Sequence, residues 1–249
     1  MVCRNAQRGE TACATVAAAA GNGGGAVLHV ADLSLLRDAK AVAAKLLAAN
    51  APVHFLVNNA GGITHPRKET VEGFEPNFAL MTLAPYALTN LLLPLLKAAS
   101  PPARVICVAS GGQYTEGLEV DDLQWTRGGF DGARQYARDK RREVALMELY
   151  ATKHAPLFFA SMHPGWADTD AVREALPQFY ESLKPRLRSP AEGADTVVWL
   201  CTAPAAKLSA GGFYFDRRSV EKHLGGAFTT YPPERVEQLE AALAKLAGL

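Results

Sequence analysis

Short apolar runs alternate with longer amphipathic stretches along most of this chain. Runs of five or six mainly apolar residues are typical of strands buried on both faces of a parallel sheet, and they occupy 53–57, 104–109 and 157–162. Weaker strands are predicted over 26–30 and 211–215, and helices over 8–20, 34–49, 71–99, 135–154 and 190–200. Strands that alternate with helices predict an α/β fold, a doubly wound parallel sheet of the Rossmann type.

The end of the chain has a helical stripe of apolar positions. These positions are Val236, Leu239, Ala242, Leu243 and Leu246, and their spacing predicts a C-terminal helix at about 232–249 that packs on the body of the protein. The sequence contains no repeat, linker or change of composition that would mark a second domain. We therefore expect a single domain over 1–249.

Composition and charge exclude several classes of function. The formal net charge is +1, so nothing favours binding to nucleic acid or to an anionic membrane. The leucine-rich run 88–96 is too short to span a bilayer, and residues 1–20 lack the apolar core of a signal peptide. The four cysteines show no paired or metal-ligand spacing, which predicts no metal site and a reducing compartment. A cytoplasmic location is expected, with organellar targeting left open.

The strongest candidate for chemistry is the pair Tyr136 and Lys140, four residues apart in a predicted helix. Residues at this spacing lie one above the other on a helix face. A nearby ammonium favours the phenolate form of a tyrosine, so the pair is a candidate general acid/base. A surface tyrosine and lysine without function can have the same spacing, and the pair alone does not decide between the two.

Three further motifs follow the three apolar runs, and together with the pair they are specific. They are 58–61 (Asn-Asn-Ala-Gly), Ser110, and Pro164-Gly165 with Thr169. The carboxyl ends of parallel strands meet at one edge, where α/β sheets bind ligands. In this order, from about residue 1 to about 215, the chain resembles the short-chain dehydrogenase/reductase family. The stretches 3–5, 131–132, 161–169 and 192–196 resemble one branch of it.

The resemblance implies an oxidoreductase that interconverts a carbonyl and an alcohol by hydride transfer with a nicotinamide dinucleotide. Tyr136 would be the general acid/base, Ser110 would bind the substrate oxygen, and Lys140 would assist the tyrosine and bind the nicotinamide ribose. The residues that the resemblance assigns to the cofactor are Arg4, Asp32, Asn58, Asn59, Ala60, Gly61, Tyr136, Lys140, Pro164, Gly165 and Thr169.

Arg4 and Asp32 each leave an alternative open. Arg4 stands where the family places an arginine against the 2′-phosphate, which favours NADP over NAD, but it is also close to the chain end and could be frayed. Asp32 would bind the adenine, or it could cap the helix predicted over 34–49. His163 is also a candidate general base, because an imidazole titrates near pH 7. Packing at a strand end is the stronger interpretation, because Tyr136 already fills the role of the base.

The sequence departs from the family in two places. The family opens with a strand and a TGxxxGxG turn that holds the pyrophosphate, and no such segment is present. The glycine cluster 21–25 follows a predicted helix instead of a strand, which indicates a flexible turn. We therefore expect a form truncated at its N-terminus, without the first strand, turn and helix. The second departure is Met81, which stands where the family has an asparagine that holds a relay water.

These departures support an alternative function, a catalytically impaired relative that acts as a binding or scaffold protein. For an active enzyme, the predicted lid over 170–187 contains Phe179, Tyr180 and Leu183. These residues suggest a small apolar carbonyl or alcohol substrate, or they pack on the core. The sequence leaves a homo-oligomer open.

Overall fold

The computed structural model describes residues 1–21, 23–224 and 228–249. The helices are α1 Ala6–Ala19, α2 Leu36–Ala49, α3 Pro76–Phe78, α4 Ala84–Lys97, α5 Gly132–Lys153, α6 Asp170–Ala175, α7 Pro177–Leu183, α8 Pro190–Thr202 and α9 Pro233–Ala247. The strands are β1 Val2–Cys3, β2 His29–Val30, β3 Phe55–Asn58, β4 Arg104–Val108, β5 Phe158–Met162, β6 Phe213–Phe215 and β7 Arg218–Val220.

The main sheet has the strand order β3-β4-β5-β6-β7. The strands from β3 to β6 pair in parallel, and β7 is antiparallel to β6. This arrangement confirms the predicted Rossmann-type α/β fold. The sequence did not predict β7, because its three residues are polar or only partly buried. The turn that creates β7 contains Asp216 and Arg217 at φ values of 48° and 60°, a left-handed conformation that hairpin turns require but that sequence patterns signal mainly with Gly or Asn.

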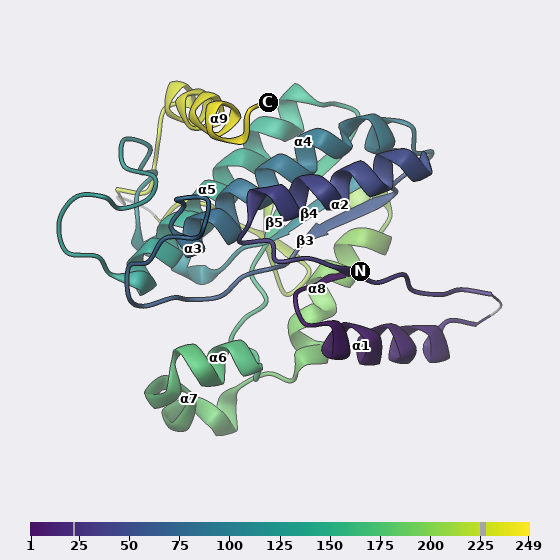
Figure 1. Cartoon of the computed structure of the whole chain (residues 1–249), viewed down its shortest axis with the longest axis horizontal. Helices are drawn as coiled ribbons and strands as arrows, with labels where there is room; N and C mark the ends of the chain where they lie inside the picture. The colour runs from purple at the N-terminus through teal and green to yellow at the C-terminus, as the bar shows by residue number, and fades with distance from the viewer. Residues whose placement is uncertain (22, 225–227) are drawn as a thin grey trace.

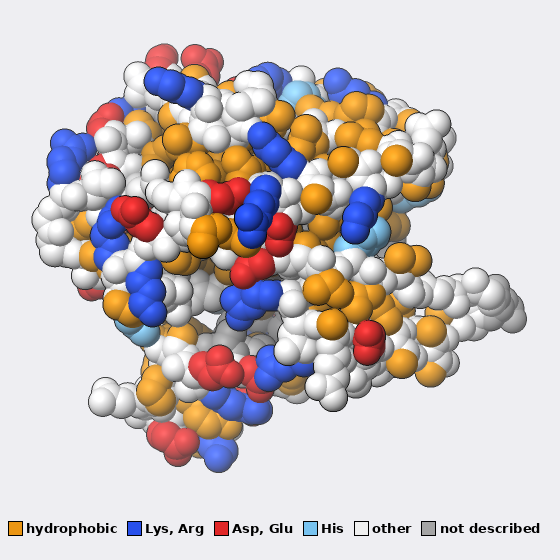
Figure 2. Space-filling view, viewed as in Figure 1, with side chains coloured by type: hydrophobic (Ala, Val, Ile, Leu, Met, Phe, Trp, Pro, Cys, Tyr) orange, Lys and Arg blue, Asp and Glu red, His pale blue; other side chains and the backbone are white. Residues whose placement is uncertain are grey.

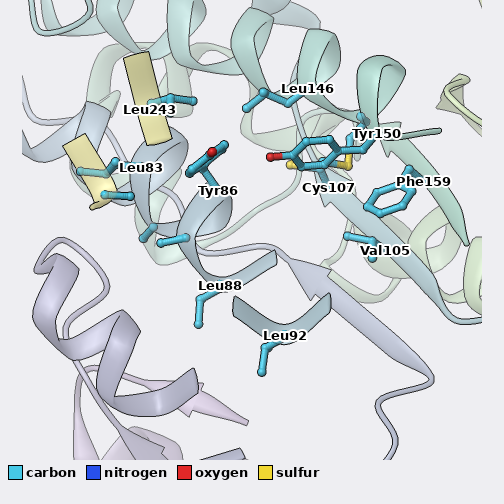
Figure 3. Close-up of a cluster of buried hydrophobic side chains, with 14 of the residues drawn as sticks. Leu83, Tyr86, Leu88, Leu92, Val105, Cys107, Leu146, Tyr150, Phe159 and Leu243 are labelled. Atoms are coloured by element: carbon cyan, nitrogen blue, oxygen red, sulfur yellow. The ribbon is translucent and has the colours of Figure 1, made fainter. Parts of the chain in front are cut away.

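Helices cover both faces of this sheet, with α2, α4 and α5 on one side and α8 on the other (Figure 1). Along β4, Val105 and Cys107 join the core cluster on the side of α4 and α5, whereas Ile106 joins the cluster that contains Leu200 of α8. Figure 3 shows the first cluster, with Tyr150 of α5 beside Cys107. Because both faces are buried, the strand is an unbroken apolar run without alternation.

The helix predicted over 71–99 is a continuous helical stretch, Pro76–Lys97, with a π-helical turn at Ala79–Leu83. It begins at Glu75, whose carboxylate accepts hydrogen bonds from the backbone N–H groups of Asn77 and Phe78. By length and composition this stretch could cross a membrane, but 67% of its most apolar window is buried inside the molecule. It is the central core helix of this fold.

A second, two-stranded parallel sheet is formed by β1 and β2 and stands apart from the main sheet. Its helix α1, of which Gly9 is the buried residue, lies away from α2, α4 and α5 (Figure 1). Within the described ranges, no strand pairs with the outer edge of β3, where Phe55 and Val57 are 51% and 40% exposed. This gap matches the expectation that the first strand of the family is missing from the sheet.

The last helix and the predicted lid differ in how they pack. In α9, Val236, Leu239 and Leu243 are buried in the main core, which confirms the predicted tail helix. The segment α6–α7 projects from the body (Figure 1), and the molecule is hollowed between this segment and the body (Figure 2). In α7, Phe179 is only partly buried and lies with its ring centre 4.1 Å from that of Trp166.

Candidate active site

Helix α5 presents Tyr136 and Lys140 at the carboxyl end of the main sheet. The Asp131 side chain caps the start of the helix by accepting from two backbone N–H groups. At Gly132, an added Cβ would lie 2.3 Å from the Thr64 carbonyl oxygen, so only glycine allows the helix to approach this loop closely. Tyr136 is half-buried, and Lys140 Nζ lies 5.5 Å from the centre of its ring.

Lys140 is buried and held by two acceptors. Its ammonium donates to the Val108 carbonyl oxygen at 2.9 Å and to Glu143 Oε1 at 3.0 Å. Burial, the largest single influence, acts to lower the pKa of Lys140, but Glu143 together with Tyr136 and Cys107 outweighs it, and the pKa is raised. Burial raises the pKa of Glu143 to about 7, although the ammonium opposes this rise. Lys140 therefore remains a cation beside Tyr136.

Ser110 lies at the end of β4 and faces the same place. Its Oγ accepts a hydrogen bond from the Gly112 N–H at 3.1 Å and so starts the 3-10 turn Gly111–Thr115. A Cβ placed on Gly112 would lie 3.6 Å from Ser110 Oγ and 3.8 Å from Tyr136 Cε1. The fold therefore makes the serine and the tyrosine close neighbours of the same glycine.

The segment 58–61 completes this edge of the sheet. Asn58 is buried and its side-chain amide donates to Thr89 Oγ1 at 3.2 Å, whereas Asn59 and Gly61 are exposed and Ala60 is half-buried. A Cβ on Gly61 would lie 3.5 Å from Lys140 Nζ and 3.5 Å from Met81 Sδ. The backbone of this segment thus runs directly past the lysine, as the resemblance implies for a cofactor-binding segment.

Met81 is completely buried at the position where the family has an asparagine. A methionine thioether has no donor and is a weak acceptor. Asn77, one turn earlier, is directed elsewhere: its side chain accepts from the Thr64 N–H at 2.7 Å and donates to the Thr64 carbonyl oxygen at 3.0 Å. The polar relay expected between position 81 and the lysine is therefore replaced by an apolar contact.

His163 takes a structural role beside Ser110. Its Nδ1 accepts a hydrogen bond from the Gly111 N–H at 3.0 Å, and its ring stacks on Phe215 with centres 5.1 Å apart. Burial lowers the pKa of His163 to about 4, and the nearby Arg188 adds to this effect. The neutral ring thus supports the turn after Ser110.

The turn after β5 is held by two local interactions. Gly165 has φ 77°, and a Cβ there would lie 2.7 Å from Arg188 Nε. Thr169 Oγ1 accepts from the Val172 N–H at 3.3 Å and caps α6. Pro164 and Thr169 therefore border the passage between the sheet edge and the segment α6–α7.

The front of the chain holds Arg4 and Asp32 together. Arg4 Nη1 lies 4.0 Å from Asp32 Oδ2, and the Arg4 side chain is 79% exposed. Asp32 Oδ1 accepts from both the N–H and the hydroxyl of Ser34, so it forms a turn before α2. The first N–H groups of α2 are capped instead by the Glu72 carboxylate, a long-range cap that no local spacing could have revealed.

A nicotinamide dinucleotide fits this site in part. The residues assigned to its nicotinamide half converge at Lys140, whereas the described residues contain no glycine turn between a strand and a helix beside β3. The glycines at 21 and 23–25 lie between α1 and β2, as the flexible-turn interpretation predicted; Asn22 in this cluster lies outside the described residues. The pyrophosphate therefore has no seat of the family type here.

Two cavities of the molecule are lined by residues other than Ser110, Tyr136 and Lys140. Among the residues that the structure describes, no group of three or more His, Cys, Asp or Glu side chains could hold a metal ion. A cavity of about 290 Å³ lined in part by Glu116, Arg138 and Tyr231 lies elsewhere. A second cavity, of about 550 Å³, is lined by charged residues that include Arg188 and Asp216, and these two pair with each other.

Two features of the site escaped sequence reasoning. Glu143 was not singled out, although its place three residues after Lys140 on one helix is a detectable signal. The π-helical turn that sets the place of Met81 has no recognisable sequence signal.

Comparisons with known proteins identify similar chains. The family model described as short chain dehydrogenase matches residues 1–118. The chain is 42% identical over 248 residues to dehydrogenase/reductase SDR family member 12 of Bos taurus, covering 99% of this chain and 77% of the relative. It is 29% identical to human polyprenol dehydrogenase, covering 88% of this chain and 68% of that protein.

Solved structures share the fold. An uncharacterized protein from Mycobacterium paratuberculosis superposes with a TM-score of 0.73 at 23% identity, covering 100% of this chain and 83% of the other. The Pseudomonas aeruginosa RhlG/NADP complex gives 0.63 at 24% identity, with coverage of 91% and 84%. The Brucella melitensis 3-ketoacyl-(acyl-carrier-protein) reductase complexed with NADH gives 0.64 at 23% identity, with coverage of 85% and 83%.

Proposed function

Because the chain belongs to the short-chain dehydrogenase/reductase family, we propose that it is an NADP-dependent oxidoreductase that interconverts a carbonyl and an alcohol. The observation that supports this proposal most strongly is the meeting of Ser110, Tyr136 and Lys140 at the carboxyl edge of the sheet. A hydroxyl, a phenol and a buried cation at one place can bind a carbonyl oxygen and move a proton to it.

Each of the three side chains has a separate task. In the reducing direction, Ser110 donates a hydrogen bond to the substrate oxygen, and the Tyr136 hydroxyl gives its proton to that oxygen. The Lys140 ammonium stabilises the phenolate that remains, because it lies beside the ring in a water-poor site. Bound NADPH would supply the hydride. In the oxidising direction, the Tyr136 phenolate accepts the proton of the alcohol.

Arg4 and the residues at the strand ends would bind the cofactor. The exposed guanidinium of Arg4 suits the 2′-phosphate, which supports NADP over NAD. Gly61, Lys140 and the turn from Pro164 to Thr169 would hold the nicotinamide half.

The substrate is proposed to be a small apolar carbonyl or alcohol. Trp166 and Phe179 pack against each other with ring centres 4.1 Å apart, and Trp166 is exposed, so apolar surface is available to a bound molecule. The similarity to a protein named polyprenol dehydrogenase is consistent with this class.

The decisive experiment replaces Tyr136 by phenylalanine. The variant should fold normally and lose carbonyl reduction with NADPH, because only the hydroxyl moves the proton. Tyr114→Phe is the matched control, since the Tyr114 hydroxyl donates to the Glu221 carbonyl oxygen and not to the site; it should retain activity. Equal rates for Tyr136→Phe and the unmodified protein would contradict the assignment. If NADPH binds too weakly for an assay, the comparison is made in the extended chain described in the Discussion.

A second candidate is a binding or scaffold protein without turnover. Met81 beside Lys140 and the missing glycine turn favour it. Titration of NADPH while recording the fluorescence of Trp125 and Trp166 distinguishes the two, because the scaffold alternative expects no saturable change at any NADPH concentration and no turnover in the extended chain.

A further inference from the structure

Lys140 has a carboxylate partner on its own helix. Glu143 lies one helical turn after Lys140, its Oε1 accepts from the ammonium at 3.0 Å, and each of the two side chains is 3% exposed. We propose that Glu143 is a positioning residue that fixes the Lys140 ammonium against Tyr136 and replaces the polar anchor missing at position 81. This inference rests on the proposed function, because the placement of the lysine matters only if Tyr136 transfers a proton.

The ammonium geometry supports this role. A lysine has three N–H donors and no acceptor, and two of them are taken by Val108 and Glu143. One donor remains for the side where Tyr136 and Gly61 lie. The two anchors thus restrict a flexible side chain to an arrangement that leaves one N–H for the reaction site.

The surroundings explain why the carboxylate is needed. Met81 Sδ and Lys140 Nζ both lie 3.5 Å from the position of a Cβ on Gly61, so the wall beside the ammonium is apolar. A buried ammonium without a charged partner tends to become a neutral amine. Without Glu143, Lys140 would lose the charge that stabilises the phenolate.

Among the described residues, the other buried carboxylate near the pair is engaged elsewhere. Asp139, on the same helix, is bound to Arg142 at 2.8 Å and to Thr82 at 2.7 Å. The other titratable groups that face the pair are Tyr136 and, from β4, Cys107. Burial raises the pKa of the Cys107 thiol well above its usual value, so Cys107 stays neutral.

The surroundings of Glu143 are also unfavourable for a carboxylate with a purely structural role. Its Oε2 is buried and has no hydrogen-bond partner in the described part of the chain. A buried carboxylate with an unpaired oxygen costs stability, and such exceptions call for a functional reason. This carboxylate accepts a hydrogen bond from the lysine, and its other polar neighbour is the Cys107 thiol.

The test measures the lysine directly, without cofactor. In protein labelled at the lysine side chains, the Nζ resonance of Lys140 is titrated by NMR in the unmodified protein and in Glu143→Gln, which keeps the shape and removes the charge. The apparent pKa of Lys140 should fall by at least about one pH unit in the variant. Glu240→Gln is the matched control, because it removes a carboxylate from Lys153 at the exposed end of the same helix; it should leave Lys140 unchanged.

An unchanged Lys140 titration in a folded Glu143→Gln protein would overturn the proposal. If this variant does not fold, Glu143→Asp keeps the charge but withdraws it by one methylene, and the pKa of Lys140 should then fall by less. No fall in that variant would also overturn the proposal.

Kinetics separate this inference from the proposed function. Glu143→Gln should lower kcat/KM by about tenfold to a hundredfold, and Met81→Asn should restore part of the loss in the double variant by supplying a polar anchor. Met81→Asn alone should raise the rate. If Tyr136→Phe abolishes turnover while Glu143→Gln changes neither rate nor titration, only the positioning role fails. If neither the unmodified protein nor any variant turns over a carbonyl, the proposed function fails. The Lys140 titration alone then tests whether Glu143 holds the ammonium.

Discussion

Both sheets of this molecule contain parallel strands, with β7 the antiparallel strand of the main sheet, yet the main sheet has a core and the small sheet does not. In the main sheet, β4 and β5 contribute Val105, Ile106 and Phe159, each fully buried between helices. In the small sheet of β1 and β2, Val30 is 55% exposed, and α1 buries Gly9. The small sheet pairs only two residues of each strand, and it removes less apolar area from water than the main sheet does.

This difference shows where the chemistry can be held. Ser110, Tyr136 and Lys140 all come from elements that pack in the main core, and preorganised side chains need such support. Arg4, the residue proposed for the 2′-phosphate, lies on the poorly packed sheet. The proton-transfer half of the site is therefore rigid, and the outer half of the cofactor site is not.

The largest expected effect comes from shortening one side chain in the main sheet and one next to the small sheet, and comparing the losses of stability. Phe159→Ala removes a fully buried ring from the main core and should lower the free energy of unfolding by about 3–5 kcal/mol. Val27→Ala removes a side chain that is 70% exposed in the segment before β2 and should change it by less than about 0.5 kcal/mol. Urea denaturation followed by circular dichroism measures both. Similar losses for the two variants would show that the small sheet has a core of its own.

The next largest effect should be on cofactor binding, when a segment that joins the two sheets is added to the chain. The pyrophosphate normally rests on N–H groups at a helix N-terminus, and one exposed charge contact through Arg4 adds only about 1 kcal/mol or less. Prefixing a strand, a TGxxxGxG turn and a helix from a relative should tighten NADPH binding by at least about a hundredfold, or about 2.7 kcal/mol.

Isothermal titration of NADPH into the printed chain and the extended chain measures this effect. An extended chain in which the second and third glycines of the turn are replaced by valine is the control, and it should bind no better than the printed chain. Micromolar binding by the printed chain would show that another segment holds the pyrophosphate.

The main core should also respond to pH through Glu75. Burial raises the pKa of Glu75 from its usual 4.5 to about 7, so its protonated form is favoured in the folded state. Its contribution to stability is complete below about pH 4.5 and is lost as the pH rises through about 7. Glu75→Gln should remove about 2 kcal/mol of this pH dependence.

Chemical denaturation of both proteins at pH 5 and pH 8 gives the difference. Only the difference between the proteins is informative, because Glu143 has the same sign as Glu75 and His163, with its lowered pKa, has the opposite sign. The same pH slope in both proteins would contradict the buried-acid interpretation of Glu75.

The smallest effect should come from the link between α1 and the segment α6–α7. Arg8 Nη2 lies 3.2 Å from Asp170 Oδ2, and both side chains are exposed. An ion pair of this kind is worth about 0–1 kcal/mol and is weakened by salt. Arg8→Ala should therefore leave the melting temperature nearly unchanged at 0.5 M NaCl. A marked loss of stability that persists in salt would indicate that α1 packs more firmly than its exposure suggests.

The sequence predicted the parts of this fold that rest on continuous patterns. The strands β4 and β5 are unbroken apolar runs because they are buried on both faces, and α9 has a regular apolar stripe that meets the core. The run at β3 is equally apolar, although Phe55 and Val57 are exposed at the open edge of the sheet. Ser110, Tyr136 and Lys140 were predicted as the site because their order along the chain resembles that of the family, and because motifs at the strand ends of a parallel sheet share one edge.

The features that were missed depend on contacts between distant residues. The Glu72 cap of α2 acts across 36 residues, and β7 exists because Asp216 and Arg217 adopt left-handed conformations. The proposed role of Glu143 depends on Met81 and Lys140 both lying beside Gly61, although the two residues are far apart in sequence. No local propensity records such contacts.

The open edge of β3 has a consequence for how the chain behaves at high concentration. Arg104 N–H donates to the His54 carbonyl oxygen, and alternate residues of a strand direct their backbone groups to opposite sides. Phe55 and Val57 therefore offer unpaired N–H and C=O groups as well as apolar side chains to any strand that approaches. Such an edge is a template for self-assembly into intermolecular sheets. The rate at which the protein precipitates from concentrated solution should accordingly depend on these two residues. The substitution Phe55→Lys should delay precipitation.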